Sequence, residues 1–451
     1  MAPDRRKSTQ RERLLAGMLA VADREGYAGA NVSQVIAHAG VSRPTFYDYF
    51  TDKDDCFLAV NRDISERLLD QIRDALDHAP PGQAAQAAVR RLIVRAEAEP
   101  VQARFLANVT MAGGPRAILQ RDRTVREIEK LVDEARAATP TEVPSPDLPT
   151  KALIGATHWL IALRIHRGER DLTAVGDELV RWAETYNRPT GEHRWRTLEP
   201  GPLPGPSPHV SELPLLPPTP IPSGRSRLSR NEIVRNQRLR ILFATAEVAA
   251  EKGYTATTVA DITGLARVDK RVFYTHFRDK QQAFLAVHEL AFQQLMAVSA
   301  SAFFSADTWP ERVWQAMHAA CQFIATHPMP YVVYVESHAV GAPAIQRVED
   351  SNAAFAIFLQ EGIQQTANPQ TRTALEAIIA AIFEIGSYQF RHRKSSELSR
   401  YSFLCAYIAL APFLGVDAAS EFVAEKQLEA AHRRRPRDGQ GPREGHAPAL
   451  V

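Results

Sequence analysis

The chain has 451 residues, of which 45% are hydrophobic and 24% charged, and its formal net charge is +2. This composition is typical of a globular protein that buries more than one core, and it excludes a disordered chain. No uninterrupted apolar run reaches the ~18 residues of a membrane span, and the longest candidate, 403–416, contains Pro412. The N-terminus lacks the apolar segment of a signal peptide, and Cys56, Cys321 and Cys405 form no metal-binding pattern. We therefore expect a cytoplasmic protein with reduced cysteines, no membrane partner, no metal and no cofactor.

The first predicted helix follows a basic arm at residues 1–10. Apolar residues at helical spacing predict that it ends at Gly26, a C-cap position. Asn31, with a glutamine three residues later, fits a variant of the capping box at the start of a second helix. Ser42 is placed to cap a third helix, and Asp52 a longer fourth one.

An internal repeat is the strongest signal in the chain. The run Phe-Tyr-Asp-Tyr-Phe-Thr-Asp-Lys at 46–53 recurs as Phe-Tyr-Thr-His-Phe-Arg-Asp-Lys at 273–280, an offset of 227 that holds over about fifty residues without a gap. A repeat must be identified before the fold is assigned, because it shows how many copies of one structural unit the chain contains. The chain is therefore predicted to hold two copies of one module of about 190 to 200 residues, each long enough for a domain.

Outside the repeat the sequence shows alanine-rich helical periodicity and no convincing alternating strands, which predicts an all-α protein. Residues 189–222 are dense in proline, and basic residues outnumber acidic ones over 225–280, as suits a phosphate backbone. A proline-rich linker extends at about 3.1 Å per residue and leaves the arrangement of the modules open. The expected order is a basic arm at 1–10, a helix-turn-helix domain at 11–53, a helical regulatory domain at 54–188, a linker at 189–229, a second helix-turn-helix domain at 230–280, a second regulatory domain at 281–430 and a disordered basic tail at 431–451.

Two short helices joined by a turn with a glycine, here Gly40, form a helix-turn-helix whose second helix is sized for the major groove. The run 31–53 resembles the DNA-binding signature of the TetR family of transcriptional regulators, and the second copy resembles it too. The resemblance covers roughly 11–60 and 236–287. It implies two modules, each with an N-terminal three-helix DNA-binding domain and a C-terminal helical domain for ligand binding and dimerisation.

The resemblance also assigns roles to residues of the first recognition helix. Arginine can donate two hydrogen bonds to guanine, and a threonine methyl can contact thymine, so the start of the helix would face base edges. Tyrosine hydroxyls and a lysine at a helix N-terminus would hold phosphates. The predicted DNA-binding residues are Ser42 at the cap of this helix, Arg43, Pro44 and Thr45 for the bases, and Tyr47, Tyr49 and Lys53 for the phosphates.

In the second copy the base-facing residues differ, whereas the phosphate-facing ones are similar. This asymmetry predicts two unlike half-sites if both modules bind DNA. Arg267 replaces the turn glycine, and a residue other than glycine in the left-handed backbone conformation costs on the order of 1 kcal/mol. The second recognition helix, which we call the second reader, is therefore strained, remodelled or nonspecific. The corresponding residues are Lys270, Arg271 and Val272 for bases and Tyr274, His276 and Lys280 for phosphates.

For the C-terminal halves, the resemblance implies a four-helix dimer interface, with equivalents inside 150–186 and 371–415. The two copies would form a covalent pseudo-dimer within one chain, or the protein would be a homodimer with four readers. Each module would hold a pocket for an unknown small-molecule effector, although most aromatic residues of helical bundles belong to the core. The candidate ligand residues are Phe105, His158 and Trp159 in the first module and Trp314, Tyr331, Tyr334, Phe355 and Phe358 in the second.

The sequence therefore predicts a regulator that binds double-stranded DNA, acts as a repressor and responds to a ligand. An enzyme is not expected, because no phosphate-binding glycine loop, metal-ligand spacing or nucleophile motif is present. The alternative is a ligand- or protein-binding module whose second helix-turn-helix has lost specific DNA recognition.

Overall fold

The computed structural model describes residues 9–140, 142–169, 171–188, 194–210, 216–221, 228–365, 370–392 and 394–432. The predicted N-terminal arm, with Arg5, Arg6 and Lys7, and the tail after residue 432 lie outside these residues. The described part is helical almost throughout, which confirms the all-α prediction. The exception is a two-residue ladder in which β1 (Ser145–Pro146) pairs antiparallel with β2 (Asn187–Arg188).

The helices of the first copy precede the linker and those of the second follow it. The first copy contains α1 (Gln10–Gly29), α2 (Val32–Ala39), α3 (Arg43–Tyr49), α4 (Lys53–Asp77), α5 (Ala84–Ala98), α6 (Pro100–Arg104), the π-helix η1 (Phe105–Val109), α7 (Thr110–Ala112), α8 (Gly114–Ala137), α9 (Thr150–His166) and α10 (Thr173–Glu184). The second copy contains α11 (Arg230–Ala256), α12 (Val259–Ala266), α13 (Lys270–His276), α14 (Lys280–Phe303), α15 (Trp309–Thr326), the π-helix η2 (Val332–Glu336), α16 (Ser337–Val340), α17 (Ala342–Phe355), α18 (Ile357–Gln365), α19 (Arg372–Arg391), the 3-10 helix η3 (Ser395–Tyr401), α20 (Ser402–Leu414) and α21 (Val416–His432).

The duplication extends well beyond the fifty residues in which the sequence reveals it. Helices α4 and α14 begin at Lys53 and Lys280, and the π-helices η1 and η2 begin at Phe105 and Val332. Both pairs keep the offset of 227 found in the sequence. A π-helix is a rare local feature that often marks a functional position. Its recurrence at one offset shows that the copied region extends at least as far as η1 and η2.

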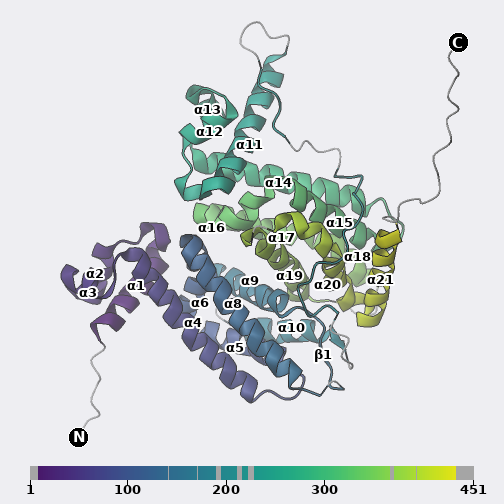
Figure 1. Ribbon diagram of the computed structural model, residues 1–451, viewed down its shortest axis with the longest axis horizontal. Coiled ribbons are helices and arrows are strands. Elements are labelled where there is room, and N and C mark those ends of the chain that lie inside the picture. Colours follow the sequence, from purple (N-terminus) through teal and green to yellow (C-terminus); the bar gives the residue numbers. More distant parts are fainter. Residues whose placement is uncertain are drawn as a thin grey trace, which may run out of the picture.

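Each DNA-binding head has its own core. In the first head, Phe46 and Phe50 of the recognition segment pack against Phe57 on α4 and Leu14 on α1. Phe273 and Phe277 belong to the corresponding core of the second head. Figure 1 shows the two heads, α1–α3 and α11–α13, projecting separately from a common body formed by the remaining helices. Helices α4 and α14 connect the heads to the body.

The body is one shared core rather than two separate ones. Helix α9 packs along α19, and α10 also contacts α19, so the C-terminal helices of the two copies meet within the chain. The largest apolar cluster contains buried residues of both copies, among them Leu153, Leu160, Ile378 and Ile385. The hydroxyl of Tyr186 donates a hydrogen bond of 2.7 Å to the carbonyl oxygen of Ile408 across this contact.

The described residues of the predicted linker are packed against the modules. The ring of Trp195 is buried and stacks on Tyr407, with a centroid distance of 5.0 Å and an interplanar angle of 15°. Downstream, the amide of Gly201 donates to the carbonyl oxygen of Arg400 at 3.2 Å. The amide of Ser207 donates to the side chain of Gln322. The segment also bonds to the first module, because the amide of Trp195 donates to the carboxylate of Asp147 at 3.4 Å and Arg196 donates to the carbonyl oxygen of Ser145 at 3.2 Å. The described linker residues are therefore attached to both modules.

Helix α14 is the one described helix that is long and apolar enough to cross a membrane by length and composition. It packs against α11, α15 and α17. A core helix of a globular protein meets the same criterion, so the property is weak support for a membrane span.

Replacing Trp195 by alanine should lower the free energy of unfolding by about 3 kcal/mol, because a buried aromatic side chain is lost and a cavity remains. Urea denaturation measures the change. Leu216→Ala, at a linker position that is 76% exposed, is the matched control and should change stability by less than about 0.5 kcal/mol. Equal small effects of the two substitutions would contradict the anchoring role.

Candidate nucleic-acid interface and ligand cavities

The first recognition helix is held in place by helix caps at each end of the motif. Asn31 and Gln34 form a reciprocal capping box at the start of α2. The Ser42 hydroxyl accepts from the amide of Thr45 at 3.2 Å and so caps α3. Gly40 adopts the left-handed conformation, with φ of 61°, that a short turn between the two helices requires. These caps were predicted from the sequence and are confirmed.

The first turn of α3 faces solvent. Ser42, Arg43 and Pro44 are exposed, whereas Thr45 is half-buried beneath them. The rings of Tyr47 and Tyr49 are 52% and 44% exposed, which is unusual for large aromatic residues and leaves both hydroxyls accessible. A protruding arginine flanked by exposed tyrosines is suited to a groove edge and its phosphates.

The two lysines assigned to phosphates are already engaged. The Lys53 ammonium donates to the carbonyl oxygen of Tyr27 at 3.1 Å and lies 4.5 Å from its ring centroid. In the second head, the Lys280 ammonium donates to the carbonyl oxygens of Tyr254, Thr255 and Thr257 at 3.0, 3.2 and 2.9 Å. Burial lowers the pKa of Lys280. An ammonium has three protons, so Lys280 has none left for a phosphate unless these bonds break. In this structure both lysines fasten α4 or α14 to the end of the first helix of the head.

The second reader tolerates the residue that replaces the turn glycine. Arg267 has φ of 50° and is the only non-glycine residue with positive φ in the part of the chain that the structure describes. The guanidinium of Arg240 donates to the carbonyl oxygens of Ala266 and Arg267, the latter at 2.9 Å. Asp269 then caps α13 by accepting from the amide of Arg271 at 2.7 Å. The turn therefore keeps the left-handed backbone of Gly40, with ψ of 49° at Arg267 against 42° at Gly40, and α13 keeps the helical form and start of α3.

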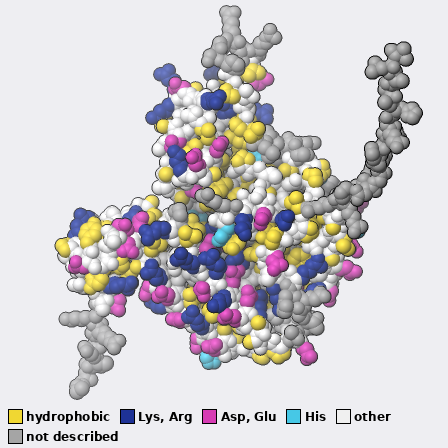
Figure 2. All heavy atoms as spheres, viewed as in Figure 1, with side chains coloured by type: hydrophobic (Ala, Val, Ile, Leu, Met, Phe, Trp, Pro, Cys, Tyr) yellow, Lys and Arg dark blue, Asp and Glu magenta, His cyan; other side chains and the backbone are white. Residues whose placement is uncertain are grey.

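The side chains of the second reader are only partly equivalent to those of the first. Lys270 and Arg271 are exposed, and Tyr274 is 51% exposed, so the polar groups of these side chains are accessible to DNA. Val272 is half-buried. Burial and the nearby Arg238 lower the pKa of His276, whose Nε2 is buried without a hydrogen-bond partner among the described residues. His276 is therefore a poorer phosphate contact than Tyr49. Figure 2 shows Lys and Arg side chains on both heads and over the middle of the visible face of the body.

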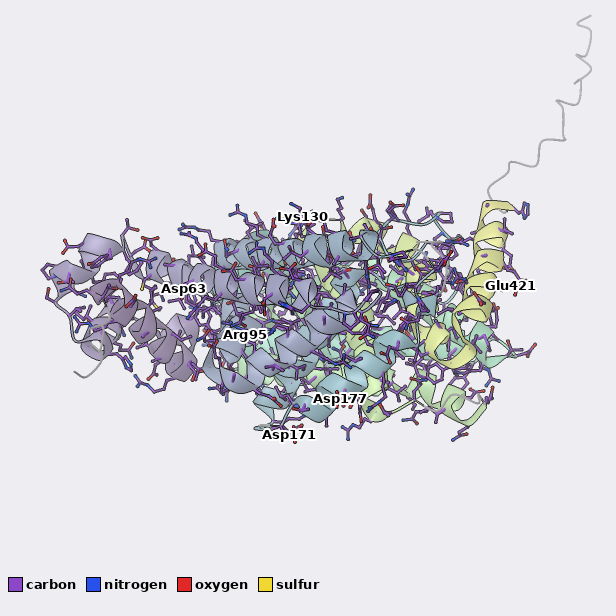
Figure 3. The ribbon with its side chains drawn as sticks, turned by 90° about the horizontal axis from the view of Figure 1, so that it is seen from below. Asp63, Arg95, Lys130, Asp171, Asp177 and Glu421 are labelled. Carbon is purple, nitrogen blue, oxygen red and sulfur yellow. The ribbon has the colours of Figure 1, made fainter. Side chains whose placement is uncertain are left out.

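Each module contains an apolar cavity, and the two cavities use equivalent positions. Leu68, Leu106 and Ile128 line the first; the positions 227 residues later, Leu295, Val333 and Phe355, line the second. Cavities of this kind between bundle helices suit mainly apolar small molecules. Figure 3 marks Arg95 among the helices of the first module, where it lines the first cavity, whereas Lys130 on α8 points outward.

Four of the eight predicted ligand residues line a cavity. His158 lines the first cavity, Tyr334 and Phe355 line the second, and Trp159 lines a third cavity between the modules. The other four side chains pack against other aromatic rings. Phe105 packs on Phe57, Trp314 stacks on Phe403, Tyr331 contacts Phe390, and Phe358 contacts Phe303. Aromatic identity alone could not separate these two groups, because it says nothing about which face of a helix meets the cavity.

The third cavity was not predicted. It lies where α9 and α19 meet and is lined by residues of both modules, including Trp159, His158, His338, Phe383 and Glu384. His158 and His338 contact this internal space while lying deep in the molecule, and burial lowers the pKa of each to about 4. Both rings are therefore neutral at pH 7.

Comparison with known proteins identifies the heads. The sequence profile described as "Bacterial regulatory proteins, tetR family" matches residues 14–60 and 241–287. The chain belongs to the TetR family. The profile covers the two TetR-family heads, and its two matches confirm the tandem duplication.

Curated relatives resemble one TetR-family module of this chain. The "Uncharacterized HTH-type transcriptional regulator YhgD" of Bacillus subtilis is 28% identical over 108 residues, 24% of this chain and 56% of YhgD. The "HTH-type transcriptional activator FasR" of Mycolicibacterium smegmatis is 29% identical over 125 residues, 28% of this chain and 57% of FasR. The chain thus spans a little over half the length of these relatives.

Solved structures of TetR-type regulators align with less than half of this chain. The fatty acid degradation regulator FadR from Bacillus halodurans gives a TM-score of 0.35 at 19% identity, over 43% of this chain and 100% of FadR. FadR from Bacillus subtilis, solved in complex with stearoyl-CoA, gives a TM-score of 0.34 at 17% identity, over 39% of this chain and 98% of that FadR. The family assignment rests on the sequence matches.

Replacing Arg240 by methionine should lower the free energy of unfolding by about 1 to 3 kcal/mol, because two carbonyl oxygens at the end of α12 lose their donor. Arg235→Met, at an exposed position on the same helix, is the control and should have little effect. Urea denaturation with hydrogen exchange of α12 and α13 would measure it. Equal stability of the two variants would show that Arg240 does not support the turn.

The free energy of unfolding should fall as the pH drops from 6.5 towards 4. In this window the unfolded chain binds protons at His158 and His338, whereas the folded chain does not, so acid favours unfolding. His338→Asn should reduce the loss between pH 7 and pH 5 by on the order of 1 kcal/mol, and His432→Asn, at an exposed position, should not. A pH dependence that is identical in both variants would contradict a buried neutral His338.

Proposed function

We propose that this protein is a sequence-specific DNA-binding regulator of transcription that carries both readers of its operator in one chain. The observation that carries the proposal is the presence of two capped recognition helices, each with exposed polar residues in its first turn. Arg43 is the base reader of the first head, and Lys270 and Arg271 are those of the second. Tyr47, Tyr49 and Tyr274 contact phosphates, whereas Lys53 and Lys280 position the recognition helices.

The two modules act as a covalent pseudo-dimer. Support comes from α9 and α19, which pack along each other, and from ion pairs between the copies that are almost fully buried. Arg121 lies 3.1 Å from Glu384, and Arg164 lies 2.6 Å from Glu376. Removing one partner of a buried ion pair costs about 3 to 5 kcal/mol, so these pairs strongly favour the present pairing.

The same ion pairs argue against a homodimer built from like modules. Glu384 lies on α19 of the second module, and α9 of the first module contains no aspartate or glutamate. Two first modules paired through α9 would therefore bury Arg121 without this carboxylate. Gly155 fits the same arrangement, because a Cβ at this position would collide with Glu384.

An asymmetric operator follows from the unlike readers. The first head presents Arg43 and Thr45, and the second presents Lys270, Arg271 and Val272 at the corresponding places. Arginine favours guanine through two hydrogen bonds, whereas the position of Thr45 changes from a hydroxyl to an apolar group in Val272. The two half-sites should therefore differ in sequence.

Ligand control would act through the π-helices. Residues of η1 and η2 line the apolar cavities, Leu106 in the first module and Val333 in the second. At the far end of η2, the carboxylate of Glu336 accepts from the amide of Tyr254 at 2.8 Å, at the end of α11. A ligand that shifts η2 would thus move the second head, and a difference of ~1 to 3 kcal/mol between the two states would suffice for regulation. A promoter reporter decides between repression, which we expect, and activation.

Arg43→Ala should relax discrimination at one base pair by about 1 to 3 kcal/mol, and Arg271→Ala should do so in the other half-site. Arg24→Ala is the charge-matched control, because Arg24 is an exposed arginine of α1 that pairs with Glu25. It should weaken binding to all DNA sequences slightly and equally. Binding to single-substituted duplexes, with sedimentation to count chains per duplex, provides the measurement. Equal losses across all sequences for Arg43→Ala would refute its role, and an effect confined to Arg43 would favour a second head without specific recognition.

A further inference from the structure

A buried carboxylate in the cavity between the modules lacks the cation that its counterpart has. Glu349 on α17 is 7% exposed and lines this cavity, and its Oε2 atom has no hydrogen-bond partner among the described residues. Burial raises the pKa of this carboxyl, whereas the exposed His166 and Arg167 lower it. An ionised carboxylate without a partner in such a place is costly.

The internal duplication shows what is missing. The residue equivalent to Glu349 is Asp122 in the first module, 227 positions earlier. Asp122 has two guanidinium partners, Arg121 at 3.1 Å and Arg391 at 3.3 Å. Glu349 has neither of these partners. The residue beside it that corresponds to Arg121 is Val348, which carries no charge. A buried arginine of the first module lies at the interface, as Arg391 does in the second, but its guanidinium is bound to other carboxylates.

This second arginine is Arg164. Its guanidinium lies 2.6 Å from Glu376 and 3.4 Å from Glu169, so it is not available to Glu349. Arg121 and Arg391 are paired with Asp122 and Glu384, whereas Glu349 forms no ion pair among the described residues.

Three aromatic rings form a further part of the wall. Phe383 stacks on Tyr334 at a centroid distance of 4.6 Å and contacts Trp159 at 5.5 Å, and all three rings line the cavity. Aromatic faces attract cations, more strongly when water is excluded. His158 and His338, neutral at pH 7, add no positive charge that would repel one.

We propose that the cavity between the modules binds an organic monocation, an ammonium group on an apolar body, with the ammonium on Glu349 and the body against Trp159, Tyr334 and Phe383. This site adjoins the apolar cavities inside the modules, because Tyr334 and Phe383 also line the second and His158 also lines the first, but Glu349 and Trp159 line neither of these two. The proposal rests on the pairing of the two modules within one chain, and it does not depend on DNA binding.

Calorimetric titration of the full chain with 2-phenylethylammonium and 1-naphthylmethylammonium tests the proposal, with 2-phenylethanol as the neutral analogue. At least one ammonium compound should bind, and Glu349→Gln should weaken it at least tenfold while leaving the alcohol unchanged. Glu425→Gln, at an exposed carboxylate of α21, is the control and should bind as the original chain does. Absence of binding by both ammonium compounds, or equal loss for the ammonium and the alcohol, would overturn the proposal.

Val348→Arg supplies a second test. It restores the guanidinium that the first module has beside Asp122, so it should fill the cation position and reduce ammonium binding at least tenfold. A thermal melt establishes that each variant is folded. Sedimentation of the same samples separates the two claims: a chain that is monomeric yet does not bind ammonium refutes only the cation site, whereas a chain dimer refutes the pairing on which the site depends. Unchanged ammonium affinity in a folded Val348→Arg chain would contradict the assigned position.

Discussion

The contact between α9 and α19 is the constraint on which the rest of the structure depends. It joins the C-terminal helices of two copies of one module into a shared core, and the positions of both heads follow from it. The contact is selective because buried ion pairs cross between the copies. Arg121 of the first copy pairs with Glu384 of the second, and Arg391 of the second pairs with Asp122 of the first. Buried ion pairs add little net stability compared with apolar packing, but a wrong pairing that leaves one of them without a partner is heavily disfavoured.

Duplication within one chain removes a restriction that a homodimer obeys. In a two-fold symmetric dimer each substitution occurs twice, at both readers and on both sides of the interface. Here the copies differ independently, which permits unlike recognition helices, an arginine, Arg267, in place of the turn glycine, and a carboxylate, Glu349, whose Oε2 atom has no hydrogen-bond partner among the described residues. The linker fits this view, because Trp195 stacks on Tyr407 of the second module while its amide donates to Asp147 of the first.

The sequence predicted well those features that depend on local chemistry. Asn31, Ser42 and Asp52 cap their helices as their side chains require, and the equivalents in the second copy do the same. Features that depend on distant partners were not accessible. The carbonyl oxygens around Lys280 belong to residues more than twenty positions away, and the carboxylate of Glu384 meets Arg121 across 263 positions. The packed positions of Phe105 and Trp314, and the anchoring of the linker, likewise depend on which helix faces meet, which a periodic pattern does not specify.

The central claim is that a single chain reads one operator with two unlike heads. Selection of preferred sites from a random duplex DNA library by the intact protein, at near-physiological salt, tests it most directly. The account predicts two different half-sites at a fixed spacing, bound by one chain. A palindromic site, which would place two copies of one reader on the DNA and imply a homodimer, or the absence of any enriched sequence, would contradict it.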